Sequence, residues 1–70
     1  MVTIEDIREK LIDAIKRSGK TYTSIAKEIG VRQQTVSQYV HNGTMPALDT
    51  LANLCIALDL DANDILCIEK

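Results

Sequence analysis

The sequence predicts an all-α fold, a compact bundle of five short helices. Apolar residues recur at helical spacing, no alternation typical of strands is sustained, and cap residues and glycines divide the chain into short segments. With 70 residues, of which 46% are hydrophobic, one small domain over residues 1–70 is expected. No stretch could cross a membrane and no signal peptide is visible, so we expect a cytoplasmic protein.

The first helix is expected over residues 4–18. Thr3 is a suitable N-cap, and Asp6, three residues later, completes the pattern of a capping box. Gly19 is expected to end the helix, because glycine readily adopts the left-handed conformation found after helix C-termini. Spacing by three and four predicts an inward stripe of Ile4, Ile7, Leu11, Ala14 and Ile15.

Residues 21–43 have the pattern of a helix-turn-helix, in which two short helices cross at a tight turn. The second helix is expected to begin after Thr21 and to end at Gly30, where a residue without Cβ adopts positive φ at little cost. The third is expected over residues 33–41 and is followed by an Asn-Gly exit. The combined spacing of the apolar, small and glycine positions favours a helix-turn-helix over an ordinary helical hairpin. The expected buried positions are Ile25, Ala26, Ile29, Val31, Val36 and Tyr39.

Two further helices are expected after the motif. Pro46 is expected to open the fourth helix, which runs to Leu58, and Asp61 is expected to cap a short fifth helix that ends at about Leu66. Asp64 lies in the first turn of the fifth helix, near the positive end of its dipole. The inward stripe of the fourth helix is expected to hold Leu48, Leu51, Cys55 and Leu58.

No metal or cofactor site is predicted. Cys55 and Cys67 do not form a CxxC pair and have no histidine nearby in sequence, and the single His41 cannot form a metal site alone. Cys55 lies in an apolar helical stripe, so it is expected to be a small buried hydrophobic residue. A disulfide is not expected in a chain of cytosolic character.

Charge is distributed unevenly, although the net charge is only −2. Residues 14–43 carry five basic residues against Glu28 alone, whereas residues 44–70 carry five acidic residues against Lys70 alone. A basic half with the motif and an acidic half away from it fit a surface that faces DNA, and an ordinary solvated surface is the alternative. The five basic residues are Lys16, Arg17, Lys20, Lys27 and Arg32.

Polar side chains occupy the outward positions of the third helix. If Val36 and Tyr39 turn inward to close the motif, the helical period places Gln34 and Gln38 on the opposite face. Gln33 is then expected at the exposed N-terminal edge of the helix. Glutamine can form two hydrogen bonds with adenine N6 and N7 in the major groove, so at least one A·T pair is expected in each half-site. A merely polar helix face is the alternative. The expected base contacts are Gln33, Gln34, Gln38 and, as a secondary candidate, Ser37.

On these features the chain resembles the Cro/C1-type helix-turn-helix family of phage and bacterial repressors. The resemblance covers about residues 11–66, and its most specific parts are the segments IAKEIGV, TVSQY and PALDTLANLCIALDLDANDIL. It implies a lambda-repressor-like DNA-binding domain that binds specific duplex DNA, usually as a dimer, to repress or sometimes activate transcription. It implies no enzyme, and the sequence contains no nucleophile–base pair or phosphate loop that would favour one.

The resemblance also implies roles for individual residues. Tyr22 and Thr23 match positions that often touch phosphate, and the glutamines of the third helix match positions that reach base edges. Arg32 stands where the family usually has a Ser or Thr cap, which costs about 1 kcal/mol of capping energy and supplies a phosphate-seeking cation. The expected phosphate contacts are Tyr22, Thr23, Lys27, Arg32 and Thr44.

Two departures from the family pattern bear on affinity and stability. Residues 43–45 lack the basic side chains that often bind phosphate after the recognition helix, which predicts weak non-specific affinity. Many members pair an arginine near the end of the first helix with a glutamate near the end of the recognition helix. Here the matching positions hold Ile15 and Val40, and we expect these apolar residues to pack against each other.

Two alternatives concern partners. A protein-interaction module of the same fold, such as an antitoxin or anti-repressor, competes with the transcriptional regulator because the acidic half would suit a basic partner. A homodimer is expected, because the C-terminal part carries more apolar residues than a small core can bury, and the alternative is that they close the core. The residues concerned are Leu54, Ile65, Leu66 and Ile68.

Overall fold

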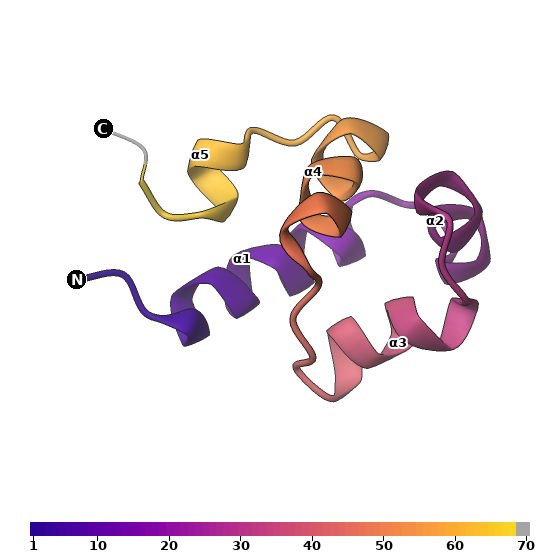
Figure 1. Ribbon diagram of the computed structural model, residues 1–70, viewed down its shortest axis with the longest axis horizontal. Coiled ribbons are helices and arrows are strands. Elements are labelled where there is room, and N and C mark those ends of the chain that lie inside the picture. Colours follow the sequence, from indigo (N-terminus) through magenta and orange to yellow (C-terminus); the bar gives the residue numbers. More distant parts are fainter. Residues whose placement is uncertain (69–70) are drawn as a thin grey trace.

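The structure, a computed structural model, describes residues 1–68, which form five helices and no strand (Figure 1). The all-α class predicted from the sequence is confirmed for this part of the chain, whose Cα radius of gyration is 11.2 Å. No helix within it has the length and apolar character needed to span a membrane. The helices are α1 Ile4–Arg17, α2 Tyr22–Ile29, α3 Gln33–His41, α4 Leu48–Ala57 and α5 Ala62–Ile65.

Local side-chain contacts fix the start of α1. The Thr3 hydroxyl oxygen accepts from the backbone N–H of Asp6 at 3.2 Å, and the backbone N–H of Thr3 donates to the Asp6 carboxylate at 3.1 Å. These two bonds complete the predicted capping box. The helix ends at Arg17 with Ser18 as C-cap, and Gly19 follows with a left-handed backbone at φ 73°. The predicted bounds are therefore confirmed to within one residue.

The caps predicted for α2 and α5 are also present, whereas α4 begins later than expected. The Thr21 hydroxyl accepts from the backbone N–H three residues later at 3.1 Å, and the Asp61 carboxylate from the N–H two residues later at 3.0 Å. The prediction that α4 opens at Pro46 is wrong, because Ala47 keeps an extended backbone with ψ 161° and Leu48 is the first helical residue. Ala47 has no side chain that could accept a capping hydrogen bond.

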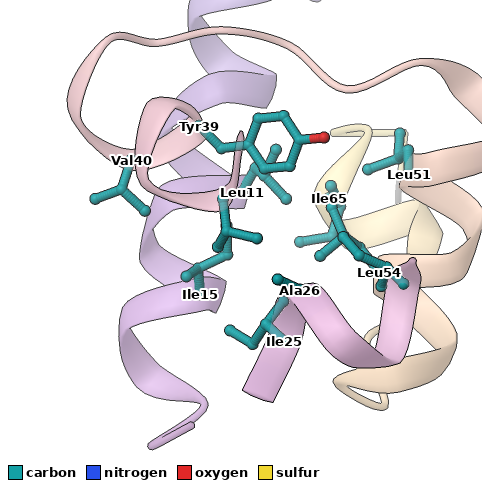
Figure 2. Packing of buried hydrophobic residues seen from close by; sticks show 11 residues of the cluster. Leu11, Ile15, Ile25, Ala26, Tyr39, Val40, Leu51, Leu54 and Ile65 are labelled. Carbon is teal, nitrogen blue, oxygen red and sulfur yellow. The ribbon is translucent and has the colours of Figure 1, made fainter. Parts of the chain in front are cut away.

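An apolar core joins all five helices in the described part of the chain (Figure 2). Leu11, Ile25 and Leu54 are at most 1% exposed, and they come from α1, α2 and α4. Removal of such side chains from water is the main favourable contribution to folding. The buried members are Leu11, Ile15, Ile25, Ala26, Ile29, Val36, Tyr39, Val40, Leu51, Leu54 and Ile65.

The inward face of α4 differs from the predicted stripe. Leu54 is fully buried and Ile65 is 2% exposed, so these two residues close the core and are not surplus apolar surface. Leu48 was expected inside but is 84% exposed, and Ile4 of α1 is 49% exposed. The reason is tertiary: α4 packs mainly against α2, and this contact centres its buried face on Leu51 and Leu54.

The positions that carry an ion pair in many relatives are apolar and buried here. Ile15 of α1 is 1% exposed and Val40 of α3 is 8% exposed, and both belong to the core cluster (Figure 2). A single charge at either position would have no partner and little water, which makes it costly.

We predict that Ile15→Arg lowers the free energy of unfolding by several kcal/mol, because it buries an uncompensated charge. Adding Val40→Glu should recover part of the loss. Ile4→Arg makes the same chemical change at an exposed position of α1 and should stay within about 0.5 kcal/mol of the parent. Urea unfolding followed by circular dichroism measures all four proteins. Equal midpoints for Ile15→Arg and the parent would contradict the prediction.

Candidate nucleic-acid interface

A left-handed turn at Gly30 sets α2 across α3. Gly30 has φ 76° and ψ 31°, and its backbone N–H donates to the carbonyl oxygen of Ala26, as does that of Val31 at 3.0 Å. Ile25, Ala26 and Ile29 form the buried side of α2. Val31, predicted to be buried, is half-buried and packs against the core. The predicted helix-turn-helix geometry is therefore present.

The exposed side of α3 collects the polar side chains singled out in the sequence. Val36, Tyr39 and Val40 face the core. The helical period turns Gln34, Gln38 and His41 outward, whereas Gln33 is exposed because it lies at the N-terminal edge of the helix. The three glutamines are exposed and Ser37 is half-buried. His41 is also exposed and shares this side, which sequence reasoning missed although it lies one helical turn after Ser37. We call this surface the α3 outer face, and its members are Gln33, Gln34, Ser37, Gln38 and His41.

The start of α2 lies beside the end of α3. The rings of Tyr22 and His41 meet edge to face, with centroids 6.1 Å apart and an interplanar angle of 67°. Tyr22 is half-buried and packs on the core, whereas Thr23 beside it is exposed. The two expected phosphate contacts at the start of α2 therefore border the α3 outer face.

Helix dipoles favour anions at this part of the surface. The first turns of α2 and α3 contain no acidic residue, whereas those of α1, α4 and α5 do. The positive ends of α2 and α3 are therefore not neutralised by a neighbouring carboxylate. Arg32 adds a cation directly before α3, where its backbone is extended and its exposed side chain makes no capping hydrogen bond.

The five basic residues of residues 14–43, the part of the chain that holds the helix-turn-helix, have different surroundings. Lys20 contacts the Glu28 carboxylate at 3.0 Å and donates to the Ala57 carbonyl oxygen at 3.0 Å, so it ties the α1–α2 connection to α2 and α4. Arg17 lies 3.1 Å from the Asp13 carboxylate. Within residues 1–68, Lys16, Lys27 and Arg32 take part in no ion pair. These three exposed cations are free to approach phosphate.

The segment between α3 and α4, residues 42–47, is the exit loop. Its Thr44 is exposed, as a phosphate contact requires, and the backbone N–H of Thr44 donates to the carbonyl oxygen of Gln38 at 3.3 Å. The Arg8 side chain of α1 reaches this loop and donates from Nε to the carbonyl oxygen of Gly43 at 2.9 Å. Sequence reasoning missed Arg8, because no local spacing connects residues 35 positions apart.

The remaining polar features of residues 1–68 include a half-buried thiol and an open depression beside α1. Within residues 1–68 no group of three or more histidine, cysteine, aspartate or glutamate residues could hold a metal ion. Burial, and then the negative charge of Asp61, raise the pKa of the Cys55 thiol, which is half-buried against the core. An open depression beside α1 is lined by Asp6, Glu9, Lys10, Asp13 and Cys67.

Comparison with protein families places this geometry in a known context. Residues 11–65 match the model of a family described as helix-turn-helix, a range that runs from the second half of α1 to the end of α5. Comparisons with curated proteins and with solved structures found no match.

We predict that Arg32→Ser stabilises the protein by about 1 kcal/mol, because serine caps α3 with a side-chain oxygen that arginine lacks. Thr21→Ala removes the corresponding bond at the start of α2 and should destabilise by a similar amount. Thermal unfolding of both variants provides the measurement. If Arg32→Ser melts no higher than the parent while Thr21→Ala melts lower, the free backbone N–H groups at the start of α3 find hydrogen-bond partners other than a cap side chain.

Proposed function

The chain belongs to the Cro/C1-type helix-turn-helix family of DNA-binding regulators, and on this basis we propose that it is a repressor that recognises a specific operator. The observation that carries the proposal is the α3 outer face, where Gln34 and Gln38 stand exposed opposite the side that is fixed in the core and Gln33 is exposed at the N-terminal edge. We further propose that it acts on bacterial or phage DNA in the cytoplasm. Family membership gives no reason to expect an enzyme.

In the proposed mechanism α3 enters the major groove and the glutamines contact base edges. A glutamine amide can donate to and accept from one adenine, which distinguishes A·T from the other pairs. Ser37 lies on the same side but is shorter and half-buried, so it is the secondary contact. Phosphate contacts set the register of the complex without selecting its sequence. The proposed phosphate contacts are Tyr22, Thr23, Lys27, Arg32 and Thr44.

Repression is the simplest action for such a protein. A bound domain that overlaps a promoter blocks access to it by occupancy alone. Activation would require an additional productive contact with the transcription machinery.

A second candidate function is a protein-interaction module such as an antitoxin or anti-repressor. The observation that favours it is the charge of residues 44–68, which carry four aspartates and no basic residue. Such a surface would suit a basic partner. Co-purification with the product of a neighbouring gene, together with failure to shift any duplex, would support this candidate over the first.

Selection of bound duplexes from a random pool tests the repressor proposal, and variants of α3 test its mechanism. We predict that Gln33→Ala or Gln34→Ala weakens binding to the selected operator by about 1–3 kcal/mol and relaxes preference at one base pair. Arg32→Ala should weaken binding to the operator and binding to a scrambled duplex about equally, because both duplexes present the same phosphate groups.

Asn63→Ala serves as the control for those variants, since it removes an exposed amide from α5, outside the α3 outer face and outside α4. All proteins are compared at one salt concentration. Equal losses on both duplexes for the two glutamine variants would show that these residues do not select sequence.

We also propose that the protein binds its operator as a homodimer, through a surface other than the one the sequence indicated. Leu66 packs against the core and Ile68 is 55% exposed. The outer side of α4 instead presents Leu48 at 84% and Ile56 at 79% exposure, with exposed Ala52 between them at four-residue spacing. A small residue between two large ones lets a second copy of the helix cross closely, and the stripe is self-complementary about that point.

We predict a dimer in sedimentation experiments at micromolar and higher concentrations. Ile56→Glu should shift the protein to monomer and weaken operator binding, because it places a charge within the apolar contact, at one of its two large side chains. Ile4→Glu, a matched change at an exposed isoleucine of α1, should leave the dimer intact. A parent protein that sediments as a monomer and also binds DNA as a monomer would contradict the proposal.

A further inference from the structure

We propose that Arg8 is a phosphate-binding residue, held in place by the carbonyl group of Gly43, and that it supplies the positive charge missing from the exit loop. The inference rests on the proposed function, since it names one more contact in the same complex. Arg8 lies outside residues 11–65, the range that matches the family, so the contact belongs to this chain's own N-terminal turns.

The contact between Arg8 and the exit loop is close and depends on glycine. Nε of Arg8 donates to the Gly43 carbonyl oxygen at 2.9 Å. Gly43 has φ 67°, and a Cβ atom at this position would lie 2.8 Å from Nε and 2.9 Å from Cδ of Arg8. Any larger residue would therefore displace the arginine as well as strain the backbone.

The hydrogen bond leaves most of the guanidinium available. Its two terminal nitrogens carry four N–H donors. Nη1 forms an ion pair with the exposed Glu5 carboxylate at 3.9 Å, which is too long for a hydrogen bond. Within residues 1–68 the guanidinium makes one hydrogen bond, the bond to Gly43. One third of the side chain is exposed. A planar group fixed through Nε presents a fork that matches phosphate geometry, and little rotamer entropy remains to be lost on binding.

The position of this fork relative to α3 fits a backbone contact. The exit loop follows the C-terminal end of α3, and its Thr44 backbone is bonded to the carbonyl oxygen of Gln38. Figure 1 shows this loop at the opposite end of α3 from the α2–α3 turn, where Arg32 lies. A duplex along the α3 outer face passes both ends, and residues 42–47 carry no charge of their own. Arg8 therefore supplies a cation at the C-terminal end of α3, as Arg32 does at the N-terminal end.

The test compares binding to the selected operator and to a scrambled duplex across a range of salt concentrations. Arg8→Gln removes the charge but keeps a side-chain N–H that can donate to the Gly43 carbonyl. We expect it to lower the affinity for both duplexes by the same factor, about five- to tenfold at low salt, and to reduce the magnitude of the log–log salt slope by about 1. Its thermal unfolding should match that of the parent.

Lys10→Ala is the matched control. It removes a cation from the same helix, but one that lies 3.4 Å from Asp64 beside α5, and it should leave the salt slope unchanged. If Arg8→Gln keeps the parent's slope and affinity, Arg8 only holds the loop and the inference is wrong, while the proposed function stands. If the parent protein binds no duplex, both the proposed function and this inference are wrong. Equal effects of Arg8→Gln and Lys10→Ala would also overturn the inference, since they would reflect net charge alone.

Discussion

Close packing of α2 on α3 is the constraint on which the rest of the structure depends. Ile25 and Val36 are fully buried, and Ala26 between the helices is 3% exposed, which leaves no room for either helix to rotate without opening the core. Gly30 makes this packing possible, because its left-handed backbone reverses the chain within a few residues. The outward direction of the glutamines is thus a consequence of how α3 is buried. A groove-binding surface on so small a protein needs this rigidity, since base contacts depend on where side chains are held.

Local interactions explain why much of the fold could be predicted from the sequence. Helix starts at Thr3, Thr21 and Asp61 depend on side chains that bond to N–H groups two or three residues away, and the turn at Gly30 depends on one residue. The rotation of α4 could not be predicted in this way. Its stripe of leucines fits more than one inward face, and contact with α2 selects the one that buries Leu54.

The same distinction applies to the candidate interface. The exposed positions of Gln34 and Gln38 follow from the helical period once the buried side of α3 is known, and that of Gln33 follows from its place at the N-terminal edge, so they were predictable. The Asn-Gly exit predicted a left-handed residue, and Gly43 has φ 67°, but the sequence did not show what lies against it. That neighbour is Arg8, and only the tertiary approach of α1 to the exit loop brings the two together. The contact between Tyr22 and His41 could not be predicted for the same reason, because it joins residues far apart in the sequence.

Charge connects the proposed DNA contacts with the proposed dimer. With a net charge of −2, and with Lys20 and Arg17 engaged by carboxylates, counterion release contributes modestly to binding. This electrostatic contribution is common to operator and competitor DNA, so a small value lowers both affinities and leaves discrimination to the base contacts. A single domain would then be selective but weakly bound. In the proposed dimer, two copies joined through α4 would combine the free energies of two half-sites without adding cations to either interface, because linkage would make the second binding event intramolecular.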